Sequence, residues 1–261
     1  MKRDIVKKIY RKFDLLFRLF NPVIDLRKLI FSVLNYPLFF KDFSNYRKRE
    51  KIFTVKFKDI YPQIHDKTKY TTFDRHYIYH PAWAARILKE TNPDIHIDIS
   101  STLYFCSIVS AFIPVKFYDF RPAQLKLNNL SCKYVDLTNI QFESNSIQSI
   151  SCMHTVEHIG LGRYGDTMDP DGDKKAINEL KRVLARNGNL LFVVPIGKPK
   201  IMYNAHRIYS YDMIMEYFKD FQLQNFSLVP DDPKLEFINN ASKEIADNQN
   251  YGCGCFWFKK V

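Results

Sequence analysis

The sequence predicts an α/β protein, built on a mostly parallel β-sheet with helices on both faces and preceded by a helical, basic N-terminal extension. From about residue 81 onward, strand patterns alternate with helical patterns, as expected for such a sheet. The first three strand patterns each end in an aspartate. Residues 1–60 carry 16 Lys and Arg against 6 Asp and Glu, so the basic charge is concentrated at the start of the chain. We therefore expect the extension over 1–70 and the α/β domain over 71–261.

Residues 1–50 show helical periodicity, with Lys and Arg between apolar residues and an interruption at Asn21-Pro22. This segment either packs on the α/β domain, forms a homodimer interface, or contacts an anionic membrane surface. Nucleic-acid binding is disfavoured, because no reader motif accompanies the basic residues. No apolar run reaches the roughly 20 residues of a membrane span, and the charged start is not typical of a signal peptide. We expect a cytoplasmic protein, with membrane association as the alternative.

The elements of the α/β domain follow in a regular order. Pro81 begins a short helix, and strands are expected over 95–99, 115–119, 133–136, 148–153 and 189–195. A helix over 174–186, with Asp173 as its cap and Gly188 after its end, precedes the fifth strand. Ser210 begins another helix, and the last strands are expected near 222–229 and 252–259.

The five cysteines form no CxxC pair and no zinc-finger spacing. Most of them lie in apolar runs, so we expect reduced, packed thiols and a reducing compartment. They are Cys106, Cys132, Cys152, Cys253 and Cys255.

Asp98, Asp119 and Asp136 end the first three predicted strands. Parallel sheets bind ligands at the carboxyl ends of their strands, so the three carboxylates are expected at one edge. Asp119 follows Asp98 by 21 residues, close to the interval of about 20 at which an acid accepts ribose hydroxyls. The turn at 100–102 reads Ser-Ser-Thr, where nucleotide-binding folds usually have glycine. The sequence predicts a nucleoside site with an atypical first turn.

This order of signals resembles the class I S-adenosylmethionine-dependent methyltransferases over residues 93–261. The strings HPAWAARIL, HIDISS, EHIGLGRYGDTMDPDGD and NAHRIYS resemble, more narrowly, the methyltransferase-like DUF268 family over roughly 70–235. The resemblance implies a Rossmann-like sheet of seven strands, the last antiparallel, and S-adenosylmethionine as cofactor. By position, Asp98 would lie near the methionine end, Asp119 would hold the ribose hydroxyls, and Asp136 would meet the adenine amine. The predicted cofactor-binding set also includes Ser100, Ser101, Phe120, Leu137 and His154.

The polar stretch 151–173 follows the strand that faces the transferred methyl group in this fold. A hydroxyl acceptor must lose its proton, and histidine suits that task near neutral pH. His154 is the predicted base, with His158 and His206 as alternatives and Glu157 beside them. A purely structural hydrogen bond remains the alternative for each histidine. The predicted acceptor-binding residues are Arg163, Tyr164, Asp166, Asn204 and Arg207.

The same stretch contains two patterns that are typical of metal sites. His154 to His158 matches the His-x-x-Glu-His pattern of inverted zinc peptidases, but Gly160 and Gly162 shorten any helix there, so no peptidase is expected. The following acids either ligate Mg²⁺ or support the start of the next helix. We predict no resident metal. Asp166, Asp169 and Asp171 are weak candidates for Mg²⁺ ligands.

The predicted function is an S-adenosylmethionine-dependent transfer of a methyl group to the oxygen of a sugar or glycan precursor in surface polysaccharide biosynthesis. The choice of acceptor follows from the family resemblance and from no individual residue. The alternative is a methyltransferase-like domain that binds a ligand or partner without turnover. The serine turn favours this alternative, whereas the dense polar loop over 151–173 opposes it.

Overall fold

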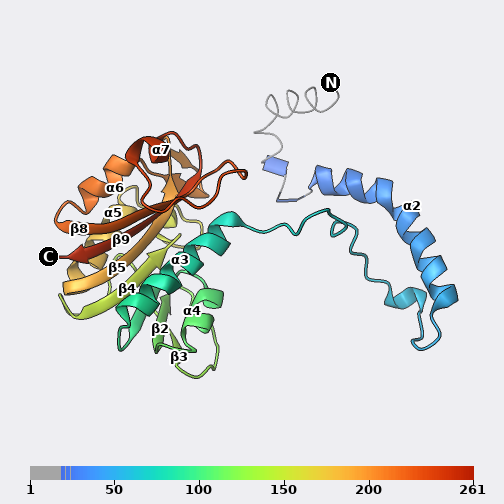
Figure 1. Cartoon of the computed structure of the whole chain (residues 1–261), viewed down its shortest axis with the longest axis horizontal. Helices are drawn as coiled ribbons and strands as arrows, with labels where there is room; N and C mark the ends of the chain where they lie inside the picture. The colour runs from blue at the N-terminus through green and yellow to red at the C-terminus, as the bar shows by residue number, and fades with distance from the viewer. Residues whose placement is uncertain (1–18, 21, 24) are drawn as a thin grey trace. The chain divides into compact units, whose positions relative to one another are not determined.

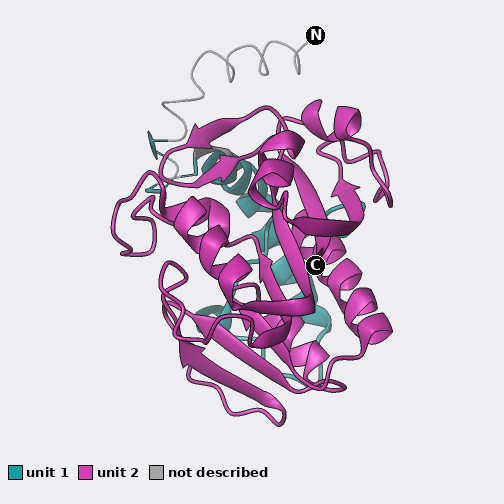
Figure 2. Cartoon of the chain, turned by 90° about the vertical axis from the view of Figure 1, so that its left-hand side faces the viewer, with its two compact units in different colours: residues 1–72 teal, residues 73–261 magenta. Residues whose placement is uncertain are grey.

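The computed structural model describes residues 19–20, 22–23 and 25–261 and divides the chain into two units, residues 1–72 and 73–261 (Figures 1 and 2). In the first unit, helix α2 spans Leu26–Arg49 and the 3₁₀ turn η1 spans Phe57–Asp59. The helix predicted within 1–50 is thus present over most of its second half, and residues 1–18 lie outside the described residues. Among the described residues, we find no helix with the length and hydropathy needed to cross a membrane.

The second unit is built on a seven-stranded sheet in the order β3-β2-β1-β4-β5-β9-β8. Strands β1 to β5 pair in parallel, whereas β9 is antiparallel to both of its neighbours. This confirms the predicted sheet with an antiparallel last strand. The strands are β1 (His96–Ile99), β2 (Val115–Asp119), β3 (Leu130–Tyr134), β4 (Ile147–Met153), β5 (Leu184–Ile196), β8 (Phe221–Val229) and β9 (Gly252–Lys260).

Helices cover both faces of this sheet, as Figure 1 shows. One apolar cluster joins the sheet to α5 and α6, and a second joins it to α3 and α4. The described elements outside the sheet are α3 (Arg75–Thr91), α4 (Leu103–Val109), η2 (Val156–His158), α5 (Gly172–Val183), α6 (Tyr211–Tyr217) and α7 (Lys243–Asp247). A separate hairpin of β6 (Lys200–Met202) and β7 (His206–Ile208) was not predicted.

Helix α3 begins at Arg75 and not at Pro81 as predicted. The Asp74 side chain caps it by accepting a hydrogen bond from the backbone N–H of Tyr77, 3.3 Å away. This cap satisfies one of the free N–H groups of the first turn. Pro81 therefore lies inside the helix, where the sequence suggested a start. The earlier start adds six residues, about 1.7 turns, and these bring His76 against His154 and Cys253 of the sheet region.

Helix α5 also differs from its prediction, because it ends at Val183 and passes directly into β5. Its N-cap residue is Asp171, and Asp173 is buried within the first turn, where it accepts a hydrogen bond from the Tyr209 hydroxyl at 2.9 Å. Gly188 lies inside β5 and not after a helix. A Cβ at Gly188 would come within 3.0 Å of backbone oxygens, so the strand needs glycine at this irregular position.

Candidate functional site

A cavity of about 380 Å³ opens at the carboxyl ends of β1 to β4. Its lining comes from the turns that follow these strands and from the loop before α5. This is the edge at which parallel α/β sheets bind ligands. The structure brings to it seven of the eight predicted cofactor-binding residues, namely Ser100, Ser101, Asp119, Phe120, Asp136, Leu137 and His154.

Ser100 adopts the backbone conformation for which glycine is usually required. Its φ is +55°, and its N–H and hydroxyl both donate to the carbonyl oxygen of Tyr118, at 2.8 and 3.2 Å. The left-handed conformation costs a non-glycine residue roughly 1–2 kcal/mol, which the hydroxyl contact helps to offset. The turn thus keeps the backbone path of a glycine turn although the residue is serine.

Asp98 is fully buried and does not line the cavity, so the expectation that three aspartates converge there holds for only two. Its carboxylate accepts hydrogen bonds from the Ser101 backbone N–H at 3.0 Å and from the Ser151 hydroxyl. The reason is that the fourth and first strands pair closely, which covers the Asp98 side chain. Asp98 therefore supports the turn from beneath the cavity floor.

Burial raises the pKa of Asp98 from 3.8 to about 6, against the opposing effect of its hydrogen bonds. The folded chain then holds a proton that the unfolded chain releases near pH 4. The stability that Asp98 contributes is full below about pH 4 and is lost as the pH rises through about 6, a change of about 3 kcal/mol.

Urea unfolding of the native chain and of Asp98→Asn across pH 4 to 7 should reveal this loss of stability. The unfolding free energy of the variant, relative to the native chain, should rise by about 2–3 kcal/mol across this range. The difference between the two proteins cancels the titration of other groups. A difference that stays constant with pH would mean that Asp98 is ionised in the folded chain throughout.

Asp119 and Asp136 each use one carboxylate oxygen to fix their own turn. Asp119 accepts from the backbone N–H of Arg121 at 2.7 Å, and Asp136 accepts from the N–H and hydroxyl of Thr138 at 2.8 and 2.7 Å. Both side chains line the cavity. Among the described residues, the second oxygen of each carboxylate has no hydrogen-bond partner. The two carboxylates can therefore accept hydrogen bonds from a ligand without losing their own support.

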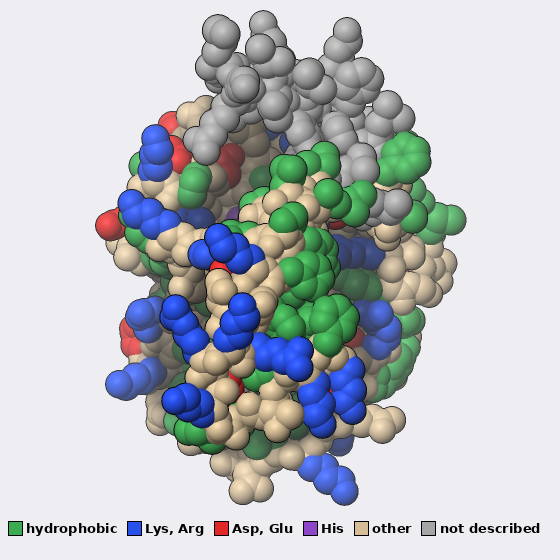
Figure 3. Space-filling view, turned by 90° about the vertical axis from the view of Figure 1, so that its right-hand side faces the viewer, with side chains coloured by type: hydrophobic (Ala, Val, Ile, Leu, Met, Phe, Trp, Pro, Cys, Tyr) green, Lys and Arg blue, Asp and Glu red, His purple; other side chains and the backbone are tan. Residues whose placement is uncertain are grey.

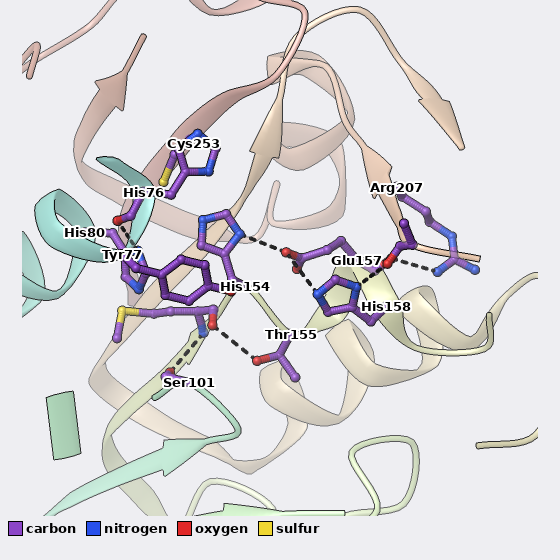
Figure 4. Close-up of polar contacts among 12 residues, drawn as sticks. His76, Tyr77, His80, Ser101, His154, Thr155, Glu157, His158, Arg207 and Cys253 are labelled. Carbon is purple, nitrogen blue, oxygen red and sulfur yellow. Dashed lines mark hydrogen bonds and ion pairs between the residues drawn. The ribbon is translucent and has the colours of Figure 1, made fainter. Parts of the chain in front are cut away.

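Glu157 lies buried between the two histidines of the polar loop (Figure 4). His154 Nδ1 lies 2.8 Å and His158 Nε2 lies 3.8 Å from the same carboxylate oxygen, Oε1. Burial raises the pKa of Glu157, but the hydrogen bond from His154 and the further polar contacts outweigh it, so the net pKa is lowered. Glu157 is therefore a carboxylate near neutral pH. Since a carboxylate only accepts, Nδ1 of His154 carries the proton.

The structure does not favour His154 as the base that the sequence predicted. With Nδ1 bound to Glu157, the nitrogen left for proton transfer is Nε2, which is buried and has no hydrogen-bond partner among the described residues. His158 offers a better geometry at the same cavity. Its Nδ1 donates to the carbonyl oxygen of Ala205 at 2.6 Å, which leaves Nε2 with a lone pair. Burial lowers the pKa of His158, so its ring is neutral near pH 7.

Of the predicted acceptor-binding residues, Tyr164 and Asp166 line the cavity, whereas Arg163, Asn204 and Arg207 do not. Arg207 is wrong as a group that grips the acceptor, because it is buried and donates to the Ile159 carbonyl oxygen at 2.6 Å. His206 also lies outside the cavity lining and contacts the ring of Tyr251 instead.

Magnesium finds no support at the acidic loop. Asp169 and Asp171 are each paired with a lysine ammonium at 2.7 Å, and both oxygens of Asp166 accept backbone N–H groups. The two lysines neutralise the charge that would attract Mg²⁺. These acids therefore shape the loop before α5, which corrects the candidate ligand set.

Sequence reasoning missed Thr155 and Arg121, which also line the cavity. The Thr155 hydroxyl donates to the Ser100 carbonyl oxygen at 3.1 Å and so links two turns of the wall. The Arg121 guanidinium lies over the Tyr164 ring, 4.5 Å from its centroid. Thr155 directly follows His154, and Arg121 directly follows Phe120. Their place beside these predicted residues is the sequence signal that could have identified them.

Comparison with known proteins supports the fold over most of the second unit. Residues 123–249 match the family described as "Caenorhabditis protein of unknown function, DUF268", which the sequence predicted over roughly 70–235. The strings at 157–173 and 204–210 lie inside the match, and those at 80–88 and 96–101 lie outside it. The YcgJ protein of Bacillus subtilis is 14% identical with a TM-score of 0.50, covering 70% of this chain and 98% of that one. A search of curated proteins gave no match.

A second solved structure has the same architecture. It is the 1,6-didemethyltoxoflavin-N1-methyltransferase of Burkholderia thailandensis, with bound 1,6-didemethyltoxoflavin and S-adenosylhomocysteine. It is 13% identical with a TM-score of 0.50, covering 70% of this chain and 79% of that one. At these identities the likeness establishes the fold, and the chemistry has to be argued from the cavity.

Proposed function

We propose, from the class I methyltransferase fold of residues 73–261 and the DUF268 match over 123–249, that this chain is an S-adenosylmethionine-dependent methyltransferase. The observation that carries the proposal is the pair of carboxylates, Asp119 and Asp136, which line one cavity and each keep one oxygen without a partner in the described part of the chain. Asp119 would accept the ribose hydroxyls and Asp136 the adenine amine. The positive φ of Ser100 supports the same reading, because it keeps the first turn in the glycine conformation.

S-adenosylmethionine, when bound, supplies a methyl group on a sulfonium, which is already a good leaving group. The chain then contributes alignment of the acceptor and removal of its proton. We assign proton removal to Nε2 of His158, whose Nδ1 is fixed by Ala205. Glu157 Oε1, 3.8 Å away, stabilises the positive charge that His158 acquires.

The acceptor we propose is a hydroxyl group of a sugar or glycan precursor. Tyr164 lines the cavity with the Arg121 guanidinium over its ring. A wall with cationic, carboxylate and hydroxyl groups suits a hydroxylated acceptor such as a sugar better than a wholly apolar one. Binding of the cofactor without transfer to any such acceptor would favour the alternative of a methyltransferase-like binding domain.

Thermal unfolding of the full chain with S-adenosylhomocysteine tests the proposal. At a ligand concentration 100 times its dissociation constant, the free energy of unfolding should rise by about 2.7 kcal/mol. Adenosine triphosphate, which carries the adenosine without the amino-acid end, serves as the control and should give a smaller shift. If neither S-adenosylmethionine nor S-adenosylhomocysteine shifts the transition, the proposed cofactor is excluded.

Helix α2 supports a second, separate part of the proposal, contact with the anionic cytoplasmic face of a membrane. Large apolar side chains are exposed along it, with Leu29 at 50%, Phe31 at 44% and Leu34 at 73%. The helix ends in the basic run Arg47, Lys48 and Arg49. Figure 3 shows hydrophobic side chains beside many Lys and Arg side chains on the face that it draws. Apolar insertion and basic charge together are what an anionic lipid surface attracts.

The full chain should therefore sediment with vesicles that contain phosphatidylserine, and less so with vesicles of phosphatidylcholine alone. Added salt should release it, because screening weakens the basic contribution. Leu34→Glu should reduce the bound fraction, whereas Leu235→Glu, an exposed leucine of the second unit, should not. Equal binding to both vesicle types, or a stable dimer that hides α2 in solution, would contradict membrane contact.

A further inference from the structure

Three buried side chains from distant parts of the second unit meet beside the cavity, and one of them also lines it. They are His76 of α3, His154 after β4 and Cys253 of β9. One ligand atom from each, a ring nitrogen of each histidine and the Cys253 sulfur, all lie within 4.8 Å of one another. Figure 4 shows His76 and Cys253 side by side, with His154 below them. Two imidazoles and a thiol are a donor set suited to Zn²⁺.

His154 is oriented as a metal ligand would be. Its Nδ1 donates to Glu157 at 2.8 Å, so the nitrogen that remains for a ligand is Nε2. Among the residues that the structure describes, this Nε2 has no hydrogen-bond partner, and the whole residue is only 7% exposed. A carboxylate bound to the far nitrogen of a ligating histidine fixes the ring and raises its basicity, and it is the usual outer partner of zinc-bound histidine. Glu157 supplies that partner here.

The surroundings also hold the first histidine in place. The His76 ring stacks on the rings of both His154 and Tyr251, at centroid distances of 5.2 and 4.9 Å. The next turn of α3 places His80 against His154, with its Nδ1 donating to the His76 carbonyl oxygen at 2.6 Å. The cluster thus combines the buried Nε2 of His154, which has no partner among the described residues, with the nearby carboxylate of Glu157.

We propose that His76, His154 and Cys253 bind one Zn²⁺, with a fourth position left for water or another small ligand. Zn–N bonds of about 2.0–2.1 Å and Zn–S bonds of about 2.3 Å place ligand atoms roughly 3.5 Å apart, so the side chains close in by about 1 Å. The Cys253 thiol loses its proton to solvent when its sulfur binds the metal. The bound ion ties α3, the loop after β4 and β9 together. The site requires no S-adenosylmethionine, so it stands or falls separately from the proposed function.

Titration of the untagged, full-length, EDTA-treated chain with Co²⁺, followed by displacement with Zn²⁺, tests the site. We expect one equivalent per chain and a thiolate-to-cobalt charge-transfer band in the near ultraviolet, which Zn²⁺ abolishes. Cys253→Ser should remove the band and weaken Zn²⁺ binding at least tenfold. Cys132→Ser, which removes a thiol elsewhere in the sheet, should leave both unchanged.

A second variant guards against misfolding of the first. His76→Asn keeps the thiol, so it should retain a charge-transfer band but lose affinity and change the visible cobalt bands as one nitrogen ligand is lost. Circular dichroism confirms that each variant is folded. The site is disproved if the native chain binds less than one equivalent, or if stoichiometric binding with the thiolate band persists in Cys253→Ser.

Discussion

Replacement of Asp119 by asparagine is expected to weaken the binding of S-adenosylhomocysteine by about 10- to 100-fold. The carboxylate would accept hydrogen bonds from the ribose hydroxyls, and a bond to a charged group is worth about 1.5–3 kcal/mol. Asparagine keeps the oxygen that accepts the Arg121 N–H, so the turn itself should survive. Isothermal titration calorimetry of the full chain measures the change directly.

Asp94→Asn is the matched control, because Asp94 is an exposed carboxylate outside the cavity. It should bind S-adenosylhomocysteine as the native chain does. Asp136→Asn should have a smaller effect than Asp119→Asn, since it loses contact with one amine rather than with two hydroxyls. Unchanged affinity in Asp119→Asn would show that the nucleoside does not lie against β2.

Gly160→Ala should destabilise the chain by about 3 kcal/mol or more and abolish ligand binding at the cavity. Gly160 has a φ of +79°, and a Cβ there would lie 2.0 Å from the backbone oxygen of Asp169. The left-handed conformation alone costs alanine roughly 1–2 kcal/mol. The clash adds to this cost, because it pushes Gly160 away from Asp169. The Gly160 carbonyl oxygen accepts from the Asp169 N–H at 2.9 Å, and this hydrogen bond holds the two arms of the loop together. Thermal unfolding and calorimetry measure the two effects.

Gly165→Ala separates the clash from the backbone strain. Its φ of +85° is similar, but a Cβ at Gly165 would meet none of the described atoms within 4 Å. It should therefore lose only the strain contribution, roughly 1–2 kcal/mol. Equal losses in the two variants would mean that the loop before α5 rearranges freely and does not shape the cavity.

Most strands were predictable because their apolar residues alternate or run continuously, and burial in a sheet demands that pattern. The exception is β3, which was predicted over 133–136 but spans Leu130–Tyr134, because only its first residue is buried. The positions of Asp119 and Asp136 at the cavity were predictable because residues that follow parallel strands lie at the same edge of the sheet. Asp98 follows the same rule in sequence, yet its side chain is covered by Ser151 of the adjacent strand. Sequence spacing gives the position along a strand but not the packing above the side chain.

The histidine and cysteine cluster could not be predicted, because its members lie some 80 to 180 residues apart and meet only through the order of the strands. Cys253 looked like a packed thiol, which its burial is consistent with. Arg207 looked like a loop cation, but its charge is enclosed by backbone carbonyl groups and Asp173. A charged residue in a polar stretch is expected to be solvated. The sequence does not show which distant segments will enclose it.

The last strand of the second unit, β9, lies between β5 and β8 and not at an edge. The backbone N–H and C=O groups of β5 and β8 that face β9 can form their sheet hydrogen bonds only once residues 252–260 are present. A chain truncated before this segment would therefore leave β5 and β8 each with an unpaired edge. Such edges are templates for aggregation, so the loss of β9 should cost solubility as well as stability.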